Sequence, residues 1–395
     1  MPSSELLNSL ILICIMLLMS AFFSGMEIAF LSRNRLREET NAKNAILLEV
    51  STGKIIYEKN KDERVSIASL TKMMGLILIF ERIENGTLNY NDKVRASINA
   101  SNMGGSQIWL ETNEVMTVSD LLKGIIMASA NDGIVAMAEK IAQTEEKFVK
   151  LMNEKAKSLG LVNTNFVNCT GLDEENHYSS AYDLSIIARE LMKYEDVFKY
   201  TTIYEDYLRV ESDNKFWLVN TNKLIKTYQG ADGLKTGMTD NAGYCMAVTA
   251  KRNNMRLLAI VLGEKEGKVR NKEVSSLLDY GFDTYEVTTI KNKGEKVGET
   301  YFDKANDNKI NIIVEEDVII LKKINDIDKE YSSEIKLNEL TLPLKKGDIL
   351  GKLHIKDGNE VIKKVDIVCD RDIEKTSFIR LFLNILKDIL IGNMI

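Results

Sequence analysis

Three short strings in one order constrain this chain more than any other feature. They are Ser69-Leu70-Thr71-Lys72, then Ser129-Ala130-Asn131, then Lys235-Thr236-Gly237. S-x-x-K and S-x-N also occur elsewhere, but K-T-G occurs once, and only the Ser69 copy is followed by the other two at intervals of about sixty and about a hundred residues. The ordered set of motifs predicts a serine nucleophile, a lysine base and a cationic residue that binds an anionic group of the substrate. The fold must therefore bring three distant segments into one cleft.

Length and charge limit the class of protein. A chain of 395 residues exceeds what one hydrophobic core usually serves, so we expect two folded domains with appendages. The net charge of -6 comes with interspersed lysine and glutamate and no basic tract, so we expect no nucleic-acid partner. The four cysteines are far apart and form no C-x-x-C pair, which predicts neither a zinc site nor a disulfide framework.

The scarcity of histidine favours a lysine as the catalytic base. Only His177 and His354 are present, which is too few for a zinc hydrolase and argues against a Ser-His-Asp triad. We therefore expect no metal and no cofactor. We also expect His177 to be a packed or loop histidine and not a base.

The spacing of the first string suits nucleophilic catalysis. A serine hydroxyl needs a base within hydrogen-bond reach, and Lys72 lies on the same helix face as Ser69, one turn later. A lysine is a base only when neutral, which burial and a second cation such as Lys235 favour. The N–H groups at the start of the Ser69 helix and that of Met238 are the expected oxyanion donors. Gly237 allows a substrate peptide to add along the edge of its strand.

The N-terminal segment predicts a membrane anchor. Leu6 to Phe23 is almost wholly apolar and long enough to cross a bilayer, although a buried soluble helix is the alternative. Glu5 precedes this run, and arginines 33, 35 and 37 follow it, so the positive-inside rule taken alone places the rest of the chain in the cytoplasm. With no convincing cleavage site, a retained segment over residues 1–38 is expected.

Part of this segment has a likeness of its own. The residues from Ser20 to Ser32 resemble the opening of the membrane module of CorC-like and cyclin-M-like ion transporters. The likeness covers only about forty residues and lacks the remaining spans of that module. It therefore bears on topology and does not imply transport.

The remaining patterns predict a mixed α/β core followed by a small β domain. A hairpin is expected at 45–58, helices at 69–83, 118–129, 133–143, 145–159, 181–194 and 269–285, and a second hairpin at 243–262. Short alternating runs after about residue 288 read as a β-sandwich with a spacing role. The predicted domains are a catalytic domain at 40–285, the β-sandwich at 286–372 and a tail at 373–395.

The tail is amphipathic, with a dominant apolar side. A helix of this kind at a chain end has no core of its own, so we expect it to lie in a membrane interface. Docking on the neighbouring domain or on a second copy is the alternative. The oligomeric state stays open.

With these residues in view, the chain from about Ala45 to its end resembles the D-alanyl-D-alanine carboxypeptidases of the low-molecular-mass penicillin-binding protein family. Besides the three motifs, the likeness includes Gly104-Gly105-Ser106-Gln107, Asn131-Asp132-Gly133, His177-Tyr178-Ser179, Gly230-Ala231-Asp232-Gly233 and Ala242-Gly243-Tyr244-Cys245. It implies the penicillin-binding, β-lactamase-like transpeptidase fold, with an antiparallel sheet, a helical subdomain and a C-terminal β domain. It also implies the bacterial cell envelope, with the catalytic domain on the outer face of the cytoplasmic membrane.

The resemblance assigns a role to each site residue. Ser69 is acylated by a peptidoglycan stem peptide ending in D-Ala-D-Ala, or by a β-lactam, with Lys72 as the base. Ser129 and Asn131 relay protons and position the substrate amide, although Ser and Asn could instead merely end a helix. Lys235 and Thr236 hold the substrate. Arg256 resembles the family arginine near the substrate's terminal carboxylate.

Two other functions remain open at this stage. A serine β-lactamase uses the same motifs but adds a deacylating carboxylate, typically in an E-x-x-L-N string, which does not occur between Asn131 and Lys235. A catalytically silent envelope binding protein or transporter fragment is the alternative from another class. No residue of the three motifs is substituted in a way that favours this alternative.

Overall fold

The computed structural model describes residues 40 and 42–376, except 302–304, 306–308 and 327–328, together with residues 16, 19, 20, 382 and 386. The chain divides into two compact units between Asp283 and Thr284. All three motif strings belong to the first unit.

An antiparallel five-stranded sheet forms the centre of the first unit, in the order β2-β1-β9-β8-β7. Its strands are β1 (Asn44–Glu49), β2 (Ile55–Lys59), β7 (Ala231–Thr239), β8 (Gly243–Arg252) and β9 (Met255–Glu264). β7 forms one edge, and β8 is its only partner among the described strands. The K-T-G string therefore lies on an edge strand, where a peptide can add by backbone pairing.

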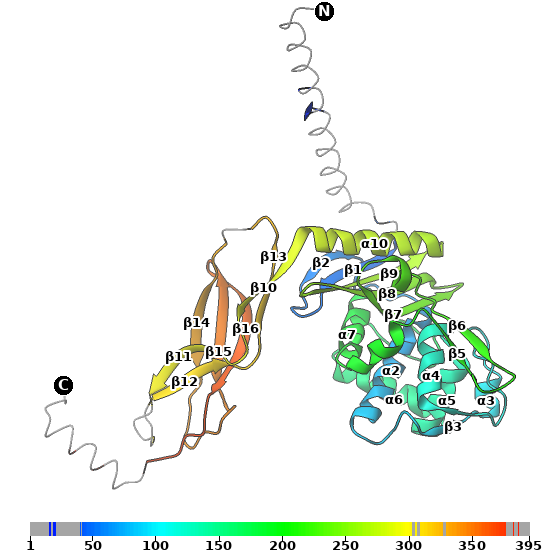
Figure 1. Ribbon diagram of the computed structural model, residues 1–395, viewed down its shortest axis with the longest axis horizontal. Helices are drawn as coiled ribbons and strands as arrows, with labels where there is room; N and C mark the ends of the chain where they lie inside the picture. The colour runs from blue at the N-terminus through cyan, green and yellow to red at the C-terminus, as the bar shows by residue number, and fades with distance from the viewer. Residues whose placement is uncertain are drawn as a thin grey trace, which may run out of the picture. The chain divides into compact units, whose positions relative to one another are not determined.

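The sheet is buried on both faces because helices cover each of them (Figure 1). On one face, α10 (Gly267–Thr284) packs so closely that a Cβ on Gly281 would lie 2.5 Å from Leu257 Cδ1. On the other face, alternate residues such as Leu258 and Ile260 join the core of the helical part. This two-sided burial explains why β9 is apolar at successive positions instead of alternating.

The helical part is arranged around α2 (Lys72–Glu84), whose first nine residues are all buried. Gly75 allows this packing, since a Cβ there would lie 3.0 Å from Ile134 Cδ1. The other long helices are α5 (Asn131–Ala142), α6 (Glu145–Ser158) and α7 (Ala181–Leu191). Short helices complete the set, namely α3 (Ile98–Ser101), α4 (Val118–Lys123), α8 (Phe198–Thr201) and α9 (Leu224–Thr227).

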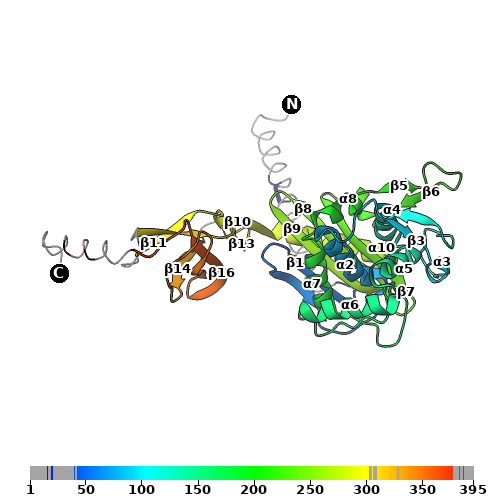
Figure 2. The same ribbon diagram turned by 90° about the horizontal axis from the view of Figure 1, so that it is seen from below.

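Two short hairpins lie outside the main sheet. The first pairs β3 (Lys93–Arg95) with β4 (Val115–Thr117), and the second pairs β5 (Glu205–Leu208) with β6 (Phe216–Val219). The β5–β6 hairpin lies at the rim of the unit in two perpendicular views (Figures 1 and 2).

The second unit is a β domain with its own apolar core. Its larger sheet has the order β11-β12-β16-β15-β14, and β10 pairs with β13 in a second sheet. The strands are β10 (Tyr285–Lys291), β11 (Lys296–Tyr301), β12 (Lys309–Val314), β13 (Val318–Lys323), β14 (Ser332–Leu337), β15 (Ile349–Asp357) and β16 (Glu360–Cys369). Alternating burial along β12 places Ile310, Ile312 and Val314 in this core.

The sequence-based expectations hold for the long elements. Both long hairpins and the helices at 133–143, 145–159 and 181–194 are confirmed within a few residues, as are the mixed fold and the C-terminal β domain. The helix expected at 118–129 is confirmed in extent, but only α4 (Val118–Lys123) is α-helical, and it continues directly as a π-helical turn, η2 (Gly124–Ala128). Neither of the two short hairpins was predicted from the sequence.

Among the residues that the structure describes, no helix is both long and apolar enough to span a bilayer. The predicted segment from Leu6 to Phe23 lies outside the described residues, apart from residues 16, 19 and 20. The tail at 377–395 does so too, apart from residues 382 and 386.

Candidate active site

The serine stands in a short 3-10 turn, η1 (Ala68–Thr71), directly before α2. The turn is held from below by a buried chain of hydrogen bonds. Thr71 Oγ1 donates to Ala68 O at 2.8 Å and lies 2.7 Å from His177 Nε2. Since the Val167 N–H donates to His177 Nδ1 at 3.1 Å, Nε2 carries the proton and donates to Thr71. Burial lowers the pKa of His177 to about 4, so the ring is neutral and packed, as expected.

Lys72 is the first residue of α2, and its side chain is fully buried. Its Nζ lies 3.0 Å from Ser69 Oγ, 2.6 Å from Asn131 Oδ1 and 2.6 Å from Thr170 O. Burial lowers the pKa of this amine from its usual 10.5 to about 7, against smaller opposing effects of Cys169 and Asp132. A large neutral fraction is therefore present near neutral pH.

Ser129 and Asn131 lie where η2 ends and α5 begins. Ser129 takes a left-handed backbone conformation with φ of 61°, which turns the chain into the cleft. Asn131 is clamped from both sides, because its backbone N–H donates to Ser106 O and its Nδ2 donates to Gly104 O, each at 2.7 Å. Among the described residues, the buried Ser129 Oγ has no hydrogen-bond partner.

The third string lines the cleft from the edge strand β7. Lys235 is buried, and its Nζ donates to Thr236 O at 3.0 Å. Burial, then the charge of Lys72, then that of Arg270 hold its pKa well below the usual range. Thr236 Oγ1 donates to Thr221 Oγ1 at 2.8 Å, and the Met238 side chain is exposed.

Two glycines let neighbouring segments close on the serine turn. A Cβ on Gly237 would lie 2.8 Å from the Ser69 nitrogen. A Cβ on Gly171, at φ +83°, would lie 2.0 Å from Ala68 O. A side chain at either position would force the backbone to move. Because Gly171 has no side chain, the Thr170 carbonyl can reach Lys72.

Arg256 is not part of this cluster, and its expected place near the substrate is wrong. Its Nη1 donates to Asp232 Oδ1 at 2.8 Å and to Thr249 Oγ1 at 2.9 Å, and its guanidinium covers the Phe198 ring. Asp232 precedes Gly237 by five residues on β7, a separation of roughly 16 Å along a strand. Arg256 therefore braces the far end of the sheet.

Arg270, and not Arg256, lies beside the K-T-G string. It lies in the first turns of α10, is nearly buried, and its Nη1 donates to Cys245 O at 3.4 Å. Cys245 pairs with Gly237 across β7 and β8, so the guanidinium sits beside the K-T-G string. The sequence carried one indication of this position. Because β7, β8 and β9 are antiparallel, the residues just after 264 lie at the same end of the sheet as Gly237.

The arrangement brings a hydroxyl, a partly neutral amine and two buried basic side chains, Lys235 and Arg270, into one cleft. Of the predicted residues, Ser69, Lys72, Ser129, Asn131 and those of the K-T-G string converge, while Arg256 does not. Within the described residues, no group of histidine, cysteine and acidic side chains is arranged to hold a metal ion. Cys169, Cys245 and Cys369 are buried free thiols there.

Comparisons with known proteins agree over both units. A family model described as D-alanyl-D-alanine carboxypeptidase matches residues 32–266, and one described as Penicillin-binding protein 5, C-terminal domain matches residues 285–375. D-alanyl-D-alanine carboxypeptidase DacF of Bacillus subtilis (strain 168) is 48% identical over 339 residues, which are 86% of this chain and 87% of that protein.

Solved structures give the same result. Penicillin binding protein 5 from Haemophilus influenzae is similar with a TM-score of 0.76 and 29% identity, covering 85% of this chain and 98% of that one. The ampicillin-bound form of Penicillin-Binding Protein D2 from Listeria monocytogenes is similar with a TM-score of 0.55 and 32% identity. That likeness covers 61% of this chain and 97% of that one.

Proposed function

The chain belongs to the D-alanyl-D-alanine carboxypeptidase family, and we propose that its reaction proceeds through an acyl-enzyme on Ser69. It is a serine-type D-alanyl-D-alanine carboxypeptidase of the cell wall with the fold of a penicillin-binding protein. Its substrates are peptidoglycan stem peptides ending in D-Ala-D-Ala, and it binds β-lactams. The roles of the individual residues, and the place of the enzyme in the cell, are our proposals.

The hydrogen-bond pattern around Lys72 Nζ carries the proposal. A neutral amine has two N–H donors and one lone pair. Asn131 Oδ1 and Thr170 O, both at 2.6 Å, are acceptors only and take the two hydrogens. The lone pair is then directed at Ser69 Oγ, 3.0 Å away, which is the geometry of a general base on its nucleophile.

Acylation and hydrolysis follow from this geometry. Lys72 takes the Ser69 proton while Oγ attacks the carbonyl carbon of the penultimate D-alanine. The N–H groups of Ser69 and Met238 stabilise the oxyanion. Ser129 gives its hydroxyl proton to the nitrogen of the departing D-alanine and recovers one from the Lys72 ammonium. Water then attacks the ester and gives a proton to Lys72, which returns it to Ser69 Oγ.

Substrate binding uses the edge strand and the cations beside it. The stem peptide pairs with the backbone of β7, where Gly237 leaves room for close approach. Its terminal carboxylate lies between Thr236, Lys235 and Arg270. Both cations are buried, so a carboxylate is a strongly favoured ligand there.

Replacement of Ser69 tests the acyl-enzyme directly. We expect the full chain to release D-alanine from a D-Ala-D-Ala-ended pentapeptide and to form a long-lived penicillin adduct. Ser69→Ala should lower D-alanine release at least about a thousandfold and abolish the adduct in mass spectrometry. Thr71→Ser, two residues later in the same turn, is the control for folding. Rapid turnover of penicillin by the wild type would instead identify a β-lactamase, and a wild type without either activity would identify a silent binding protein.

The pKa of Lys72 sets the pH dependence. Acylation requires the neutral amine, so kcat/KM should rise with pH and level off above the pKa of about 7. Because one pH unit below a pKa leaves about a tenth of the base neutral, the rate of penicillin acylation at pH 6 should be about tenfold below its plateau. Stopped-flow measurements from pH 5.5 to 9 check this. A flat profile, or one that rises only near pH 10, contradicts the role of Lys72.

Two matched arginine variants distinguish the proposed substrate-binding role of Arg270 from the structural role of Arg256. Loss of a charged hydrogen bond to the carboxylate is worth about 1.5–3 kcal/mol, so Arg270→Gln should raise KM for the pentapeptide about ten- to a hundredfold. The preference of the enzyme for a free carboxylate over a C-terminal amide should weaken in parallel. Arg256→Gln should lower thermal stability with little change of KM. If Arg256→Gln raises KM as much as Arg270→Gln, the reassignment is wrong.

We also propose that the catalytic unit faces the outer side of the cytoplasmic membrane, held by Leu6–Phe23 and by the tail at 373–395. The cell-wall substrate and the apolar pattern of both segments support this topology. The full chain should sediment with membranes, and added protease should digest it in spheroplasts. Deletion of residues 1–38 and 373–395 together should release it to the soluble fraction. Protection from protease in intact spheroplasts contradicts the proposal.

A further inference from the structure

A second groove lies beside the catalytic cleft, at the rim of the first unit. It has a volume of about 870 Å³, within the range of ligand clefts of roughly 300–1,000 Å³. Its walls are the chain from Trp109 to Glu114, part of α4 and the β5–β6 hairpin. The proposed reaction uses none of these walls.

Trp109 is presented to this groove in an unusual way. Its neighbours Ile108 and Leu110 are buried, whereas its own side chain is 69% exposed. Its φ of +57° lies in the left-handed region, which is unfavourable for a large side chain. A strained backbone that exposes a large ring persists only where the surroundings impose it, and such positions gather at functional sites.

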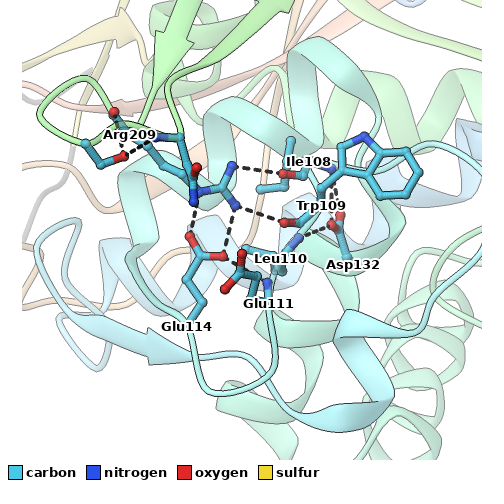
Figure 3. A network of polar contacts seen from close by, with 9 residues as sticks. Ile108, Trp109, Leu110, Glu111, Glu114, Asp132 and Arg209 are labelled. Atoms are coloured by element: carbon cyan, nitrogen blue, oxygen red, sulfur yellow. Dashed lines mark hydrogen bonds and ion pairs between the residues drawn. The ribbon is translucent and has the colours of Figure 1, made fainter.

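The buried Asp132 and the partly buried Arg209 hold this conformation (Figure 3). The Asp132 carboxylate accepts from the Ile108 N–H at 3.1 Å and the Leu110 N–H at 3.0 Å. Arg209 donates to Ile108 O at 3.0 Å and to Trp109 O at 3.2 Å. Glu114 binds Arg209 in a bidentate pair at 2.6 and 2.9 Å. The backbone that carries the indole is therefore held by charged groups on both sides of Trp109, which limits the loss of backbone freedom on binding.

The groove is tied to the catalytic residues through the chain itself. Asp132, which fixes Trp109, follows Asn131, which binds Lys72. On the opposite wall, the chain after β6 reaches Thr221, whose N–H donates to Met127 O and whose Oγ1 accepts from Thr236. A ligand in the groove therefore lies next to the peptide-binding cleft.

The lining identifies the chemistry of the ligand. Aromatic rings alternate with polar groups, and four acidic residues stand against two basic ones, Lys123 and Arg209. Arg209 is already paired with Glu114, so the groove repels anions. A sugar ring without charge offers a flat C–H face to an aromatic ring and hydroxyl donors to carboxylates.

We propose that this groove is a saccharide subsite that binds the glycan strand of peptidoglycan while the stem peptide occupies the catalytic cleft. Trp109 stacks on a sugar ring, and the carboxylates of Glu111 and Glu211 accept hydrogen bonds from the hydroxyl groups of that sugar. The proposal rests on the proposed function, because the occupant is the polymer that carries the stem peptide. A protein partner is the competing occupant, and the mixed, acidic lining favours a sugar over an apolar protein surface.

A kinetic comparison of two substrates tests the subsite. The quantity is the ratio of kcat/KM for a pentapeptide attached to a glycan chain to kcat/KM for the same free pentapeptide. Trp109→Ala removes one stacking contact, so the ratio should fall about three- to tenfold. The matched control is Trp217→Ala, since Trp217 is also exposed, at 58%, but lies outside the groove lining. An unchanged ratio in Trp109→Ala, or an equal fall in both variants, overturns the proposal.

Binding can be measured without catalysis, because Trp109 and Trp217 are the two tryptophans of the chain. The full chain with Ser69→Ala and Trp217→Phe keeps Trp109 as the single reporter. Its fluorescence should change saturably on addition of the neutral tetramer of N-acetylglucosamine. No change overturns the subsite. A wild type that releases no D-alanine contradicts the proposed function instead, and this titration then still decides about the groove.

Discussion

A buried lysine amine of lowered pKa, held against a serine hydroxyl, is the constraint on which the rest of this structure depends. Lys72 begins a helix whose first turns lie entirely in the core, so its side chain is fully buried. Two carbonyl oxygens from distant segments, Asn131 Oδ1 and Thr170 O, then fix both hydrogens of the neutral amine. Burial and the charge of Lys72 in turn hold the pKa of the nearby Lys235 well below its usual range. The segments that meet at Lys72 therefore all help to keep part of its amine neutral.

Close approach of backbone segments makes this possible. The Thr170 carbonyl reaches Lys72 only because Gly171 has no Cβ to strike the Ala68 carbonyl. On the opposite side, Gly237 brings the edge strand against the Ser69 nitrogen. His177 supports the turn from beneath as a neutral donor to Thr71. The glycines and the histidine are therefore parts of one packing solution around the serine turn.

The sequence predicted the parts of the site that short strings encode, and it failed where chain topology decides. Ser69, Lys72 and Asn131 were found because their chemistry depends on local spacing and motif order. Arg256 was misplaced because sequence proximity to a hairpin says nothing of which end of the sheet a side chain occupies. Arg270 was missed because it reaches the site only after β9 has returned the chain to the level of Gly237. The short hairpins and η2 escaped detection because their residues follow no clear period.

The pair Asn131 and Asp132 shows how the fold combines two tasks in one rigid piece. Asn131 holds the chain at Gly104 and Ser106 while its amide oxygen faces Lys72. Asp132 holds the same chain a few residues later, on either side of Trp109. The wall of the cleft and the platform of the neighbouring groove are therefore fastened to the same helix start. Changes in the exposed side chains of the groove can alter which polymer binds without moving the base, because both clamps bind backbone groups of residues 104–110 and no exposed side chain.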